Sequence, residues 1–362
     1  MAEWIECTLG DLVTFQRGHD LPRSQMHDGK YPVVGSNGII GFHNEYTTNE
    51  PSITIGRSGN VGKPFIYYGK TWSHNTTLYI KDYKGNDPGF IFYFLKTLDL
   101  ANYAGGSAVP TLNRNHIRTL SICVPKNVNQ QKKIGIFLKK FDEKIKMNES
   151  INNNLEQQAL ATYQHMFIDN ASSNWKEGTL SDVAEITMGQ SPRSSSYNKD
   201  SIGTIFFQGR AEFGFRFPTI RLYTTEPKRM ACANDALMSV RAPVGDINVA
   251  HTDCCIGRGL AAIHSKNNHQ SFVLYTMFSL KKRLDIFNGE GTVFGSINKI
   301  SLLEMPILIP PIEKLDEFEM LVAPIDITIR NNYDEICCLE QLRDSLLPSL
   351  MSGELDVSKI NI

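Results

Sequence analysis

Side chains that donate hydrogen bonds are concentrated in glycine-rich stretches of this sequence. The stretch Arg57-Ser58-Gly59-Asn60-Val61-Gly62-Lys63 places two cations, a hydroxyl and an amide within a few positions, directly after an apolar β-branched segment. Lys, Arg and small hydroxyl groups contact phosphate oxygens, whereas Arg, Lys, Asn and Gln read base edges. The chemistry indicated for such a loop is the noncovalent binding of a polyanion.

Further donors of the same kind occur in both halves of the chain. They are His74, Asn75 and Arg114 in the first half, and Gln208, Arg210, Arg216, Arg241, Arg258 and Lys299 in the second. Arg57 and Arg241 are the strongest candidates, because each comes shortly before a Val-Gly pair. For any single residue the alternative is an ordinary surface side chain or a structural salt bridge. A residue shared by both halves can also hold the fold.

No catalytic signature is complete in the sequence. Phe287-Asn288-Gly289-Glu290-Gly291 fits a cofactor-binding glycine turn, but a helix end precedes it and no helix follows. Gly62-Lys63 resembles a P-loop, yet an arginine and a proline occupy two of its required positions. The tetrapeptide D/N-P-P-Y/F, H-E-x-x-H and G-x-S-x-G are absent, and the histidines do not cluster at ligand spacing. We therefore expect a binding protein without catalytic residues, metal or cofactor.

The candidate loops belong to a unit that occurs twice. Trp4-x4-Leu9-x-Asp11-x6-Gly18 recurs as Trp175-x4-Leu180-x-Asp182-x6-Gly189, with an offset of 171. Four further matches keep the same order at offsets of 183–185: Ile55–Gly62 with Ser239–Gly245, Gly106-x6-Asn113 with Gly291-x6-Asn298, Ser121–Pro125 with Pro306–Pro310, and Leu155–Gln157 with Leu339–Gln341. An ordered, slowly drifting offset is typical of a duplication with loop insertions.

Each repeat begins with a β-rich part and ends with a helical one. Short β-branched stretches such as Ser52–Ile55 and Thr77–Ile80 predict strands, and a helix is expected near Asp87–Leu100. The predicted domains are residues 1–128 and 172–311. Two helices at residues 129–171 and 312–362 follow them, the second with a tail.

The helical parts carry apolar residues at alternating steps of four and three, which is the pattern of a coiled-coil seam. The predicted seam residues are Ile134, Leu138, Phe141, Ile145, Asn148 and Leu155 in the first helix, and Phe318, Val322, Ile325, Ile329, Asn332 and Leu339 in the second. About 35–40 residues at 1.5 Å each give roughly 50–60 Å, which is longer than a small domain is wide. The alternative is a seam that packs on its own domain.

Two details of the helices lead to specific expectations. Asn148 and Asn332 occupy the same seam position, and a buried polar pair of this kind fixes register. Pro324 lies within the second helix and predicts a kink or a break there. If equivalent domains precede both helices, the helices are antiparallel and carry one domain at each end. The expected fold is therefore α+β, with two β-rich domains separated by an antiparallel two-helix coiled coil in a pseudo-twofold repeat.

Charge and composition narrow the class of protein. The chain has 362 residues and a net charge of −1, but the two predicted domains carry +2 and +3, the first helix +1 and the C-terminal segment −7. Basic domains favour a polyanion, and the acidic segment favours a protein partner. No apolar run approaches the ~18 residues of a membrane span. The seven cysteines show no C-x-x-C pair, and the start lacks the order of a signal peptide, so we expect a reduced, cytoplasmic protein.

The combination resembles the specificity (S) subunits of Type I restriction-modification systems, also called HsdS-like proteins. The resemblance covers essentially the whole chain. It rests on the two W-x4-L-x-D openings, the second continuing Gly189-Gln190-Ser191-Pro192, the loops ending in Asn113 and Asn298, and the strands ending in Pro125 and Pro310. It also includes the heptad helix that ends in Leu346–Leu355. A longer loop, Gly18–Pro22, is a mild departure from the family.

The resemblance implies two target recognition domains, each reading one half of a split site in double-stranded DNA. It implies a subunit that is not itself an enzyme and that takes part in DNA methylation and defence against foreign DNA. It also implies docking of two methylating (M) subunits and of restriction (R) subunits. The expected DNA-binding residues are the donors named above, from Arg57, Ser58, Asn60 and Lys63 to Lys299. The alternatives are the recognition subunit of a related Type II enzyme with a bipartite site, and a coiled-coil scaffold that does not bind DNA.

Overall fold

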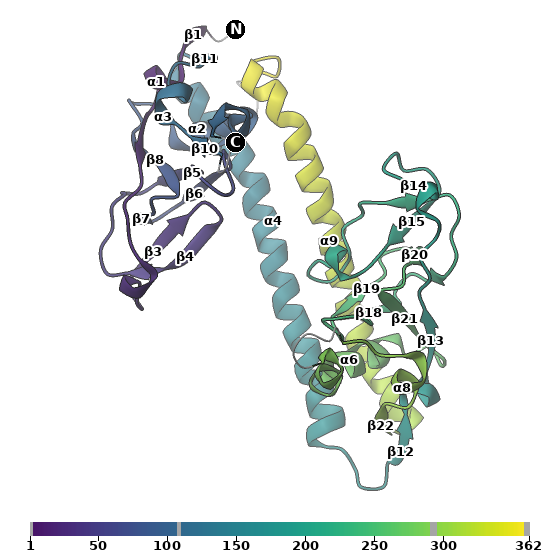
Figure 1. The fold of residues 1–362 in the computed structure, drawn as a ribbon. Coiled ribbons are helices and arrows are strands. Elements are labelled where there is room, and N and C mark those ends of the chain that lie inside the picture. Colours follow the sequence, from purple (N-terminus) through teal and green to yellow (C-terminus); the bar gives the residue numbers. More distant parts are fainter. Residues whose placement is uncertain (1–2, 107–109, 290–294, 358–362) are drawn as a thin grey trace. The chain divides into compact units, whose positions relative to one another are not determined.

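The computed structural model of the chain describes residues 3–106, 110–289 and 295–357 (Figure 1). The chain divides into two compact units, the first made of residues 1–148 and 335–362 and the second of residues 149–334. Both units combine short strands with helices, which confirms the α+β class expected from the sequence. None of the helices in the described ranges is long and apolar enough to cross a membrane.

The first unit opens with a strand pair and a capped turn of helix. Strand β1 (Trp4–Thr8) pairs antiparallel with β11 (Ser121–Pro125). Helix α1 (Leu9–Leu12) follows at once. The Thr8 hydroxyl accepts a hydrogen bond from the Asp11 N–H at 3.2 Å, and the Asp11 carboxylate accepts one from the Thr8 N–H at 2.9 Å. This reciprocal capping box fixes where α1 begins.

The core of the first unit is an antiparallel sheet in the order β2-β8-β5-β6. Its strands are β2 (Thr14–Arg17), β8 (Thr77–Asp82), β5 (Ser52–Gly56) and β6 (Pro64–Tyr67). A second sheet in the order β4-β3-β7 contains β3 (Tyr31–Gly35), β4 (Gly38–His43) and β7 (Trp72–Ser73). The unit also contains helix α2 (Pro88–Thr97), helix α3 (Arg114–Ile117) and the short pair β9 (Ala104–Gly105) and β10 (Thr111–Leu112). The two strands and the helix expected in this region are confirmed.

The second unit repeats this order of elements. Strand β12 (Lys176–Thr179) pairs with β22 (Pro306–Ile309), and α5 (Leu180–Val183) follows β12. The core sheet, in the order β13-β21-β18-β19, contains β13 (Ala184–Met188), β21 (Leu260–Ser265), β18 (Ala236–Ser239) and β19 (Ile247–Val249). Helices α6 (Gln270–Ser279), α7 (Lys281–Leu284) and α8 (Lys299–Leu303) follow it. The capping box recurs between Thr179 and Asp182, so the duplication extends to local hydrogen bonds.

The second sheets of the two units differ in size. In the second unit the order is β14-β16-β15-β20-β17, from β14 (Tyr197–Asn198), β16 (Tyr223–Thr224), β15 (Thr204–Phe207), β20 (Cys254–Ile256) and β17 (Met230–Ala231). Its parallel pair β15–β20 corresponds to the parallel pair β3–β7 of the first unit. The extra strands therefore belong to a sheet whose parallel strand pair is common to both units.

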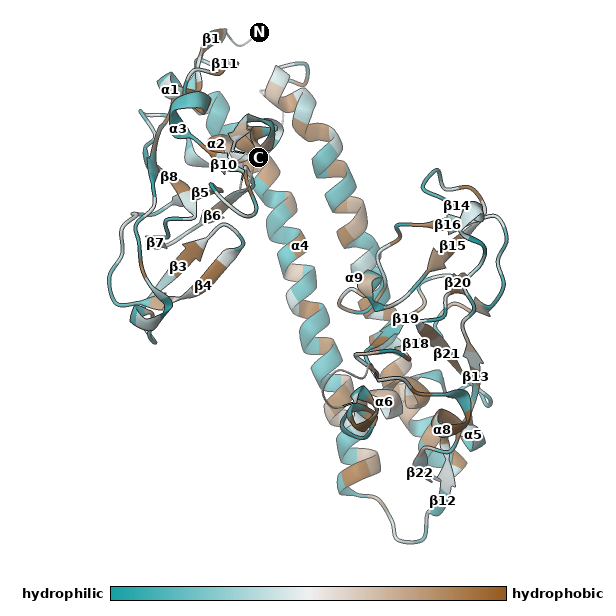
Figure 2. Cartoon of the chain, in the orientation of Figure 1, coloured by the Kyte–Doolittle hydropathy of each residue, from teal (hydrophilic) through white to brown (hydrophobic). Residues whose placement is uncertain are grey.

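In Figure 2, β3, β4, β18 and β21 show the brown of apolar residues, whereas most of the visible face of helix α4 is teal.

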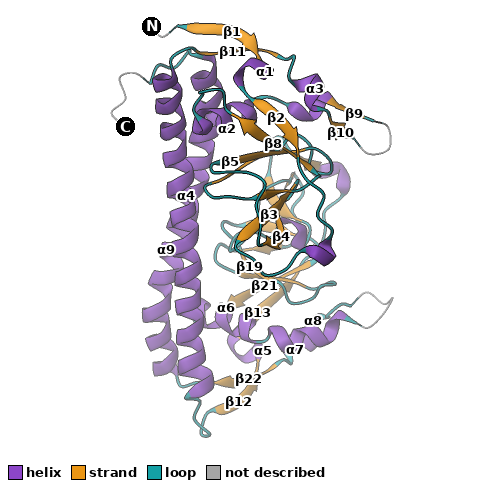
Figure 3. Ribbon diagram, turned by 90° about the vertical axis from the view of Figure 1, so that its left-hand side faces the viewer, coloured by secondary structure: helices purple, strands orange, loops and turns teal. Residues whose placement is uncertain are grey.

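Two long helices contribute to both units. Helix α4 (Val128–Tyr163) is followed by a π-helical turn (Gln164–Asp169), and helix α9 spans Ile312–Ser352. In the first unit Leu138 of α4 shares a core with Leu350 near the end of α9. In the second unit Tyr163 at the end of α4 shares a core with Phe318 near the start of α9. The two helices are therefore antiparallel and lie side by side within each unit (Figure 1 and Figure 3).

The predicted seam residues are all at least half-buried. Those fully buried are Ile134, Leu138, Ile145, Asn148, Phe318, Val322 and Ile329, and those half-buried are Phe141, Leu155, Ile325, Asn332 and Leu339. Several of them also contact strands and helices of their own unit, because Ile134 and Leu138 share a core with Phe90 of α2. The seam therefore joins the helix pair to each domain as well as joining the two helices.

The expected pairing of Asn148 with Asn332 is wrong. The Asn148 side chain donates to the Glu335 carboxylate at 2.7 Å in the first unit. In the second unit the Asn332 side chain donates to the Asn152 side-chain oxygen at 2.8 Å, and Asn152 donates to the Ile329 carbonyl at 3.2 Å. The same heptad position in two antiparallel helices need not meet at the same level, so each asparagine bonds to whichever polar group lies opposite.

Pro324 does not break α9. The helix is continuous from Ile312 to Ser352, and the Pro324 carbonyl accepts a hydrogen bond from the Thr328 hydroxyl at 2.8 Å. A proline removes the hydrogen bond to the carbonyl four residues earlier, here that of Met320. Because Met320 and Pro324 are both exposed, water can satisfy that carbonyl. The break expected from the sequence is therefore absent.

Candidate nucleic-acid interface

The predicted donor loop of the first unit is a tight turn between β5 and β6. The Gly56 N–H donates to the Lys63 carbonyl at 3.1 Å, and the Gly62 N–H donates to the Gly56 carbonyl at 2.8 Å. Gly62 has a φ of +80°, and a Cβ at this position would meet the Ala101 nitrogen at 2.7 Å. A residue with a side chain would be strained at this φ and would clash with the Ala101 nitrogen, so glycine is required for this conformation of the turn. Arg57, Ser58 and Asn60 are half-buried on it, whereas Lys63 is exposed.

Arg57 lines a depression of about 470 Å³ that is rich in cations. The residues around it are Arg17, Arg57, Leu78, Gly105, Thr111, Leu112, Asn113, Arg114 and His116, and none of these is acidic. Burial, and secondly the like charge of Arg17, lower the pKa of Arg57 from its ordinary value. An anion entering the depression would offset both effects, since it brings a negative charge next to the guanidinium and accepts its hydrogen bonds. The depression therefore suits a phosphate group.

Two further predicted residues lie beside this loop. The N–H groups of Arg57 and Ser58 both donate to the Thr76 carbonyl, at 2.8 and 3.2 Å. The predicted His74 and Asn75 directly precede Thr76, and the Arg57 guanidinium donates to the Asn75 carbonyl at 3.5 Å. The Asn75 side chain also donates to Asp20. The structure therefore brings Arg57, Ser58, His74 and Asn75 together in the first unit.

The corresponding loop of the second unit has the same backbone hydrogen bonds. The Ser239 N–H donates to the Asp246 carbonyl, and the Gly245 N–H donates to the Ser239 carbonyl, both at 2.9 Å. Gly245 has a φ of +83° and is the structural equivalent of Gly62. Ser239–Gly245 therefore corresponds to Gly56–Gly62.

This correspondence corrects the pairing of Arg57 with Arg241. The β-bridge from Ser58 to Thr111 matches the bridge from Arg241 to Ser296. Arg241 is thus the counterpart of Ser58, and the buried Val240 is the counterpart of Arg57. The two loops have the same length, so the two arginines are simply at neighbouring positions, one residue out of register.

The cations that do correspond are Arg114 and Lys299. Each is the first residue of a short helix, α3 or α8, and each follows an asparagine cap: Asn113 accepts from the Asn115 N–H and Asn298 accepts from the Ser301 N–H, both at 2.9 Å. The segment before each helix is tied to the donor loop, because the Leu112 N–H donates to the Arg57 carbonyl and the Ile297 N–H to the Val240 carbonyl. Both cations are exposed. The repeated cation of this surface is therefore at the start of the short helix.

Three exposed donors of the second unit lie on neighbouring strand ends. The Gly257 N–H donates to the Phe207 carbonyl at 2.8 Å, next to Gln208, and a Cβ at Gly257 would meet the Gln208 carbonyl oxygen at 2.8 Å. Arg258 follows Gly257, and its N–H donates to the Ser191 hydroxyl at 3.2 Å. The Val240 N–H donates to the Gly259 carbonyl, which brings Arg241 to the same edge. Arg210 is paired with Asp246 at the end of the adjacent loop.

Arg216 is not a surface donor, and its prediction as a DNA contact is wrong. Its side chain is buried, with Nη2 donating to the Tyr275 hydroxyl and the Asp326 carboxylate, both at 2.7 Å. Its Nη1 lies 3.6 Å from the Glu156 carboxylate. The guanidinium thus neutralises acids from α4 and α9 inside the second unit. It has a structural role.

Some residues of the candidate interface are not among those predicted from the sequence. Arg17 and His116 line the cationic depression of the first unit, and Asp246 pairs with a predicted donor in the second. Arg17 directly precedes Gly18, which belongs to the repeated opening motif, so its position next to that motif could have identified it as a candidate. Within the described ranges no group of three or more His, Cys, Asp or Glu residues could hold a metal ion. Glu290 and Gly291 of the glycine-rich stretch lie outside the described residues.

Comparisons with known proteins agree with this geometry. A model of the Type I restriction modification DNA specificity domain matches the chain twice, at residues 1–157 and 172–318. The chain therefore belongs to the family of Type I restriction-modification DNA specificity proteins. This result confirms the resemblance seen in the sequence and identifies the chain as a DNA-recognition subunit.

Individual relatives span most of the chain. The type I restriction enzyme MjaX specificity subunit of Methanocaldococcus jannaschii is 31% identical over 332 residues, which are 84% of this chain and 77% of the relative. The MjaIX specificity subunit of the same organism is 23% identical over 75% of this chain and 70% of its own length. The crystal structure of a Type I restriction-modification S subunit from M. genitalium has the same fold, with a TM-score of 0.67, 18% identity and coverage of 97% and 96%.

Proposed function

We propose that each of the two β-rich domains reads one half of a split site in double-stranded DNA, within a Type I restriction-modification complex. The observation that supports this most directly is the repeated donor surface. Each domain carries a Gly-closed loop after its central strand and a cation on the short helix tied to that loop. Two copies of one reading surface match two half-sites.

Different residues of the surface perform different parts of this recognition. In the first domain, Arg17, Arg57 and Arg114 surround a depression suited to phosphate, which fixes position on the duplex. Ser58, Asn60, Lys63, His74 and Asn75 lie on or beside the same loop. In the second domain Gln208, Arg210, Arg241, Arg258 and Lys299 take these roles. The residues that differ between domains carry the sequence preference, since the half-sites differ while the backbone geometry is shared.

We further propose that the chain is not an enzyme and acts in the cytoplasm with partner subunits. Two methylating (M) subunits supply methyl transfer, and restriction (R) subunits supply cleavage. The acidic C-terminal segment, with its charge of −7 over residues 312–362, favours a protein contact over a DNA contact. In the part of the chain that the structure describes, the donor surfaces offer hydrogen bonds and charge, which are suited to noncovalent binding.

The purified chain alone is expected to bind duplex DNA weakly and to show no methyl transfer, cleavage or ATP hydrolysis. Co-expression with the methylating subunits is expected to give methylation at one bipartite motif, which genome-wide mapping of methylated bases would reveal. Robust catalysis by the homogeneous isolated chain would contradict the proposal. If the chain binds no duplex DNA at any salt concentration, the coiled-coil scaffold is favoured. If it co-purifies with a single fused enzyme, the Type II alternative is favoured.

Replacing Arg57 by alanine is expected to weaken binding by about 1–3 kcal/mol, because one charge-assisted contact is lost. If the guanidinium also contacts a base edge, discrimination should relax in one half-site only, as measured by competition with oligonucleotides altered in either half; if it contacts only phosphate, binding should weaken with discrimination unchanged. Lys81→Ala is the matched control, because Lys81 is an exposed cation of the same unit, on β8. A uniform loss at both halves together with a lower melting temperature would show that Arg57 holds the fold.

A further inference from the structure

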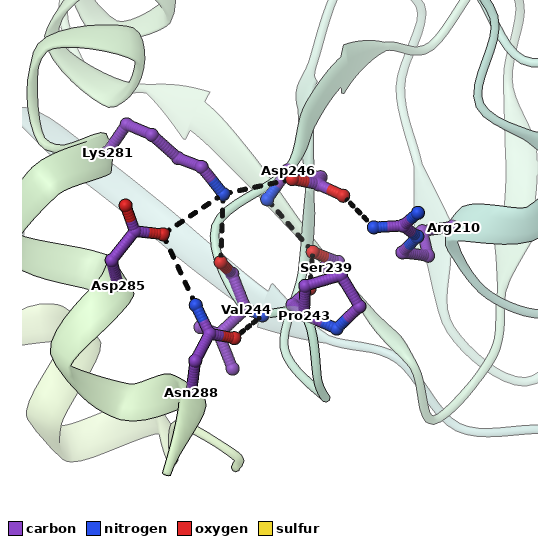
Figure 4. A network of polar contacts seen from close by, with 8 residues as sticks. All are labelled: Arg210, Ser239, Pro243, Val244, Asp246, Lys281, Asp285 and Asn288. Atoms are coloured by element: carbon purple, nitrogen blue, oxygen red, sulfur yellow. Dashed lines mark hydrogen bonds and ion pairs between the residues drawn. The ribbon is translucent and has the colours of Figure 1, made fainter. Parts of the chain in front are cut away.

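A carboxylate at the end of the second donor loop binds two cations from other elements (Figure 4). Asp246 pairs through one oxygen with the Arg210 guanidinium and through the other with the Lys281 ammonium at 2.9 Å. Arg210 begins a short 3-10 turn after β15, and Lys281 begins α7. Asp246 therefore links three segments that are distant in sequence.

Asp246 itself is held by the backbone around it. Its N–H donates to the Ser239 hydroxyl at 2.9 Å, and that hydroxyl donates to the Pro243 carbonyl at 2.7 Å. Val244, between them, is fixed at both of its backbone groups: its N–H donates to the Asn288 side chain at 2.5 Å and its carbonyl accepts from Lys281 at 3.1 Å. The carboxylate therefore has a defined position, and so does the guanidinium that it holds.

Arg210 remains available to a ligand despite this pairing. Its side chain is 47% exposed, and Asp246 contacts one terminal nitrogen, Nη1. Its position on the turn after Gln208 and Gly209 places it on the edge that also carries Arg258 and Arg241. Nη2 and Nε are not bonded by Asp246, so they can donate to a ligand while the carboxylate holds the side chain.

The equivalent position in the first unit carries the opposite charge. Lys63 accepts from the Gly56 N–H as Asp246 accepts from the Ser239 N–H, so the two residues correspond. The Lys63 ammonium is exposed and lies 5.6 Å from the centre of the Phe65 ring. The backbone carbonyl closes the loop in both copies, so the side chain at this position is free to differ between them. The charge reversal is what we expect of a position that differs with the sequence being read.

We propose that Asp246 is a specificity-determining residue of the second domain, which positions Arg210 to read a guanine in the major groove. This inference rests on the proposed function. Guanine presents two acceptors, and an arginine fork that is already oriented satisfies both at little cost in side-chain entropy. Asp246 and Asp285 together balance the charges of Arg210 and Lys281, which lowers the attraction of this cluster for phosphate and favours contact of the arginine with a base edge.

The test uses the full chain assembled with its methylating subunits. Asp246→Asn removes the charge, and Arg210→Lys keeps the charge but removes the fork. Each is expected to relax preference at one guanine of the second half-site by roughly ten- to a hundredfold. The double variant is expected to relax it no further, and the first half-site should be unchanged. Asp200→Asn, an exposed acid of the same unit, is the control and should leave the profile as in the wild type.

The possible failures are distinguishable. If the wild-type complex methylates no bipartite site, the proposed function fails. If the wild type does so but Asp246→Asn only lowers binding to all sites and the melting temperature, Asp246 is structural and the inference is overturned. If Arg210→Lys relaxes the guanine position and a folded Asp246→Asn does not, Arg210 reads the base without Asp246, which also overturns it. Parallel relaxation by both variants supports the inference.

Discussion

Replacing Arg216 by methionine is expected to lower the free energy of unfolding of the second unit by about 3–5 kcal/mol, because it leaves buried carboxylates without their counter-ion. Asp326 and Glu156 contact the guanidinium at 2.7 and 3.6 Å, and the Tyr275 hydroxyl loses a donor. The melting temperature of the unit, followed by calorimetry, measures the effect. Arg221→Met removes an exposed arginine of the same unit and should change it little.

The cause of this loss is testable by a second change and by pH. Adding Glu156→Gln and Asp326→Asn to the methionine variant is expected to recover much of the stability, since neutral amides are less costly to bury than charges. Burial already raises the pKa of Glu156 and of Asp326. A carboxyl whose pKa is raised in the folded state binds its proton more tightly there, so acidification favours that state. The charge of Arg216 lowers both pKa values, so its removal should raise them further and the single variant should gain more from acidification than the wild type. The deficit of the single variant should therefore shrink as the pH falls, and a deficit independent of pH would contradict this account.

Sequence patterns predicted the parts of this fold that depend on local periodicity. The alternating steps of four and three located both long helices and buried residues such as Ile134, Leu138, Phe318 and Val322. The repeated W-x4-L-x-D openings marked equivalent positions, and the structure shows that these positions form capping boxes at Thr8 and Thr179, in which Asp at the third helical position accepts from the cap backbone. These features are determined within a few residues, so a single sequence is enough to find them.

Features that depend on a distant partner were missed. Arg216 is surrounded by Phe215, Phe217 and Pro218, but its acids come from 60 residues earlier and 110 residues later. The Asn148 partner depends on the axial stagger of two antiparallel helices, which the heptad pattern leaves open. The equivalence of Arg241 with Ser58 depends on how the two loops align, and the β-bridges and the loop-closing hydrogen bonds reveal that alignment. Composition alone does not determine such tertiary pairings.

Lengthening both long helices by one heptad is expected to widen the unread gap between the half-sites by roughly 3 base pairs. Seven residues add about 10.5 Å of helix at 1.5 Å per residue, and B-DNA rises about 3.4 Å per base pair. Duplicating residues 144–150 in α4 and 327–333 in α9 keeps the seam in phase, because each segment contains two seam positions. It also leaves Asn148 with Glu335 in one unit and Asn152 with Asn332 in the other. Genome-wide mapping of methylated bases in cells with the extended chain measures the gap.

The half-site sequences themselves should not change, because no residue of either donor loop is altered. Methylation at the new site is expected to be weaker, since about 3 extra base pairs rotate one half-site by roughly 100° relative to the other. Duplicating the segment in α4 alone is the control: it leaves the helices unequal in length and should lower the melting temperature without defining a new gap. An unchanged gap in a stable double extension would show that the helices do not set the spacing. Altered half-sites would show that helix length and base reading are not separate.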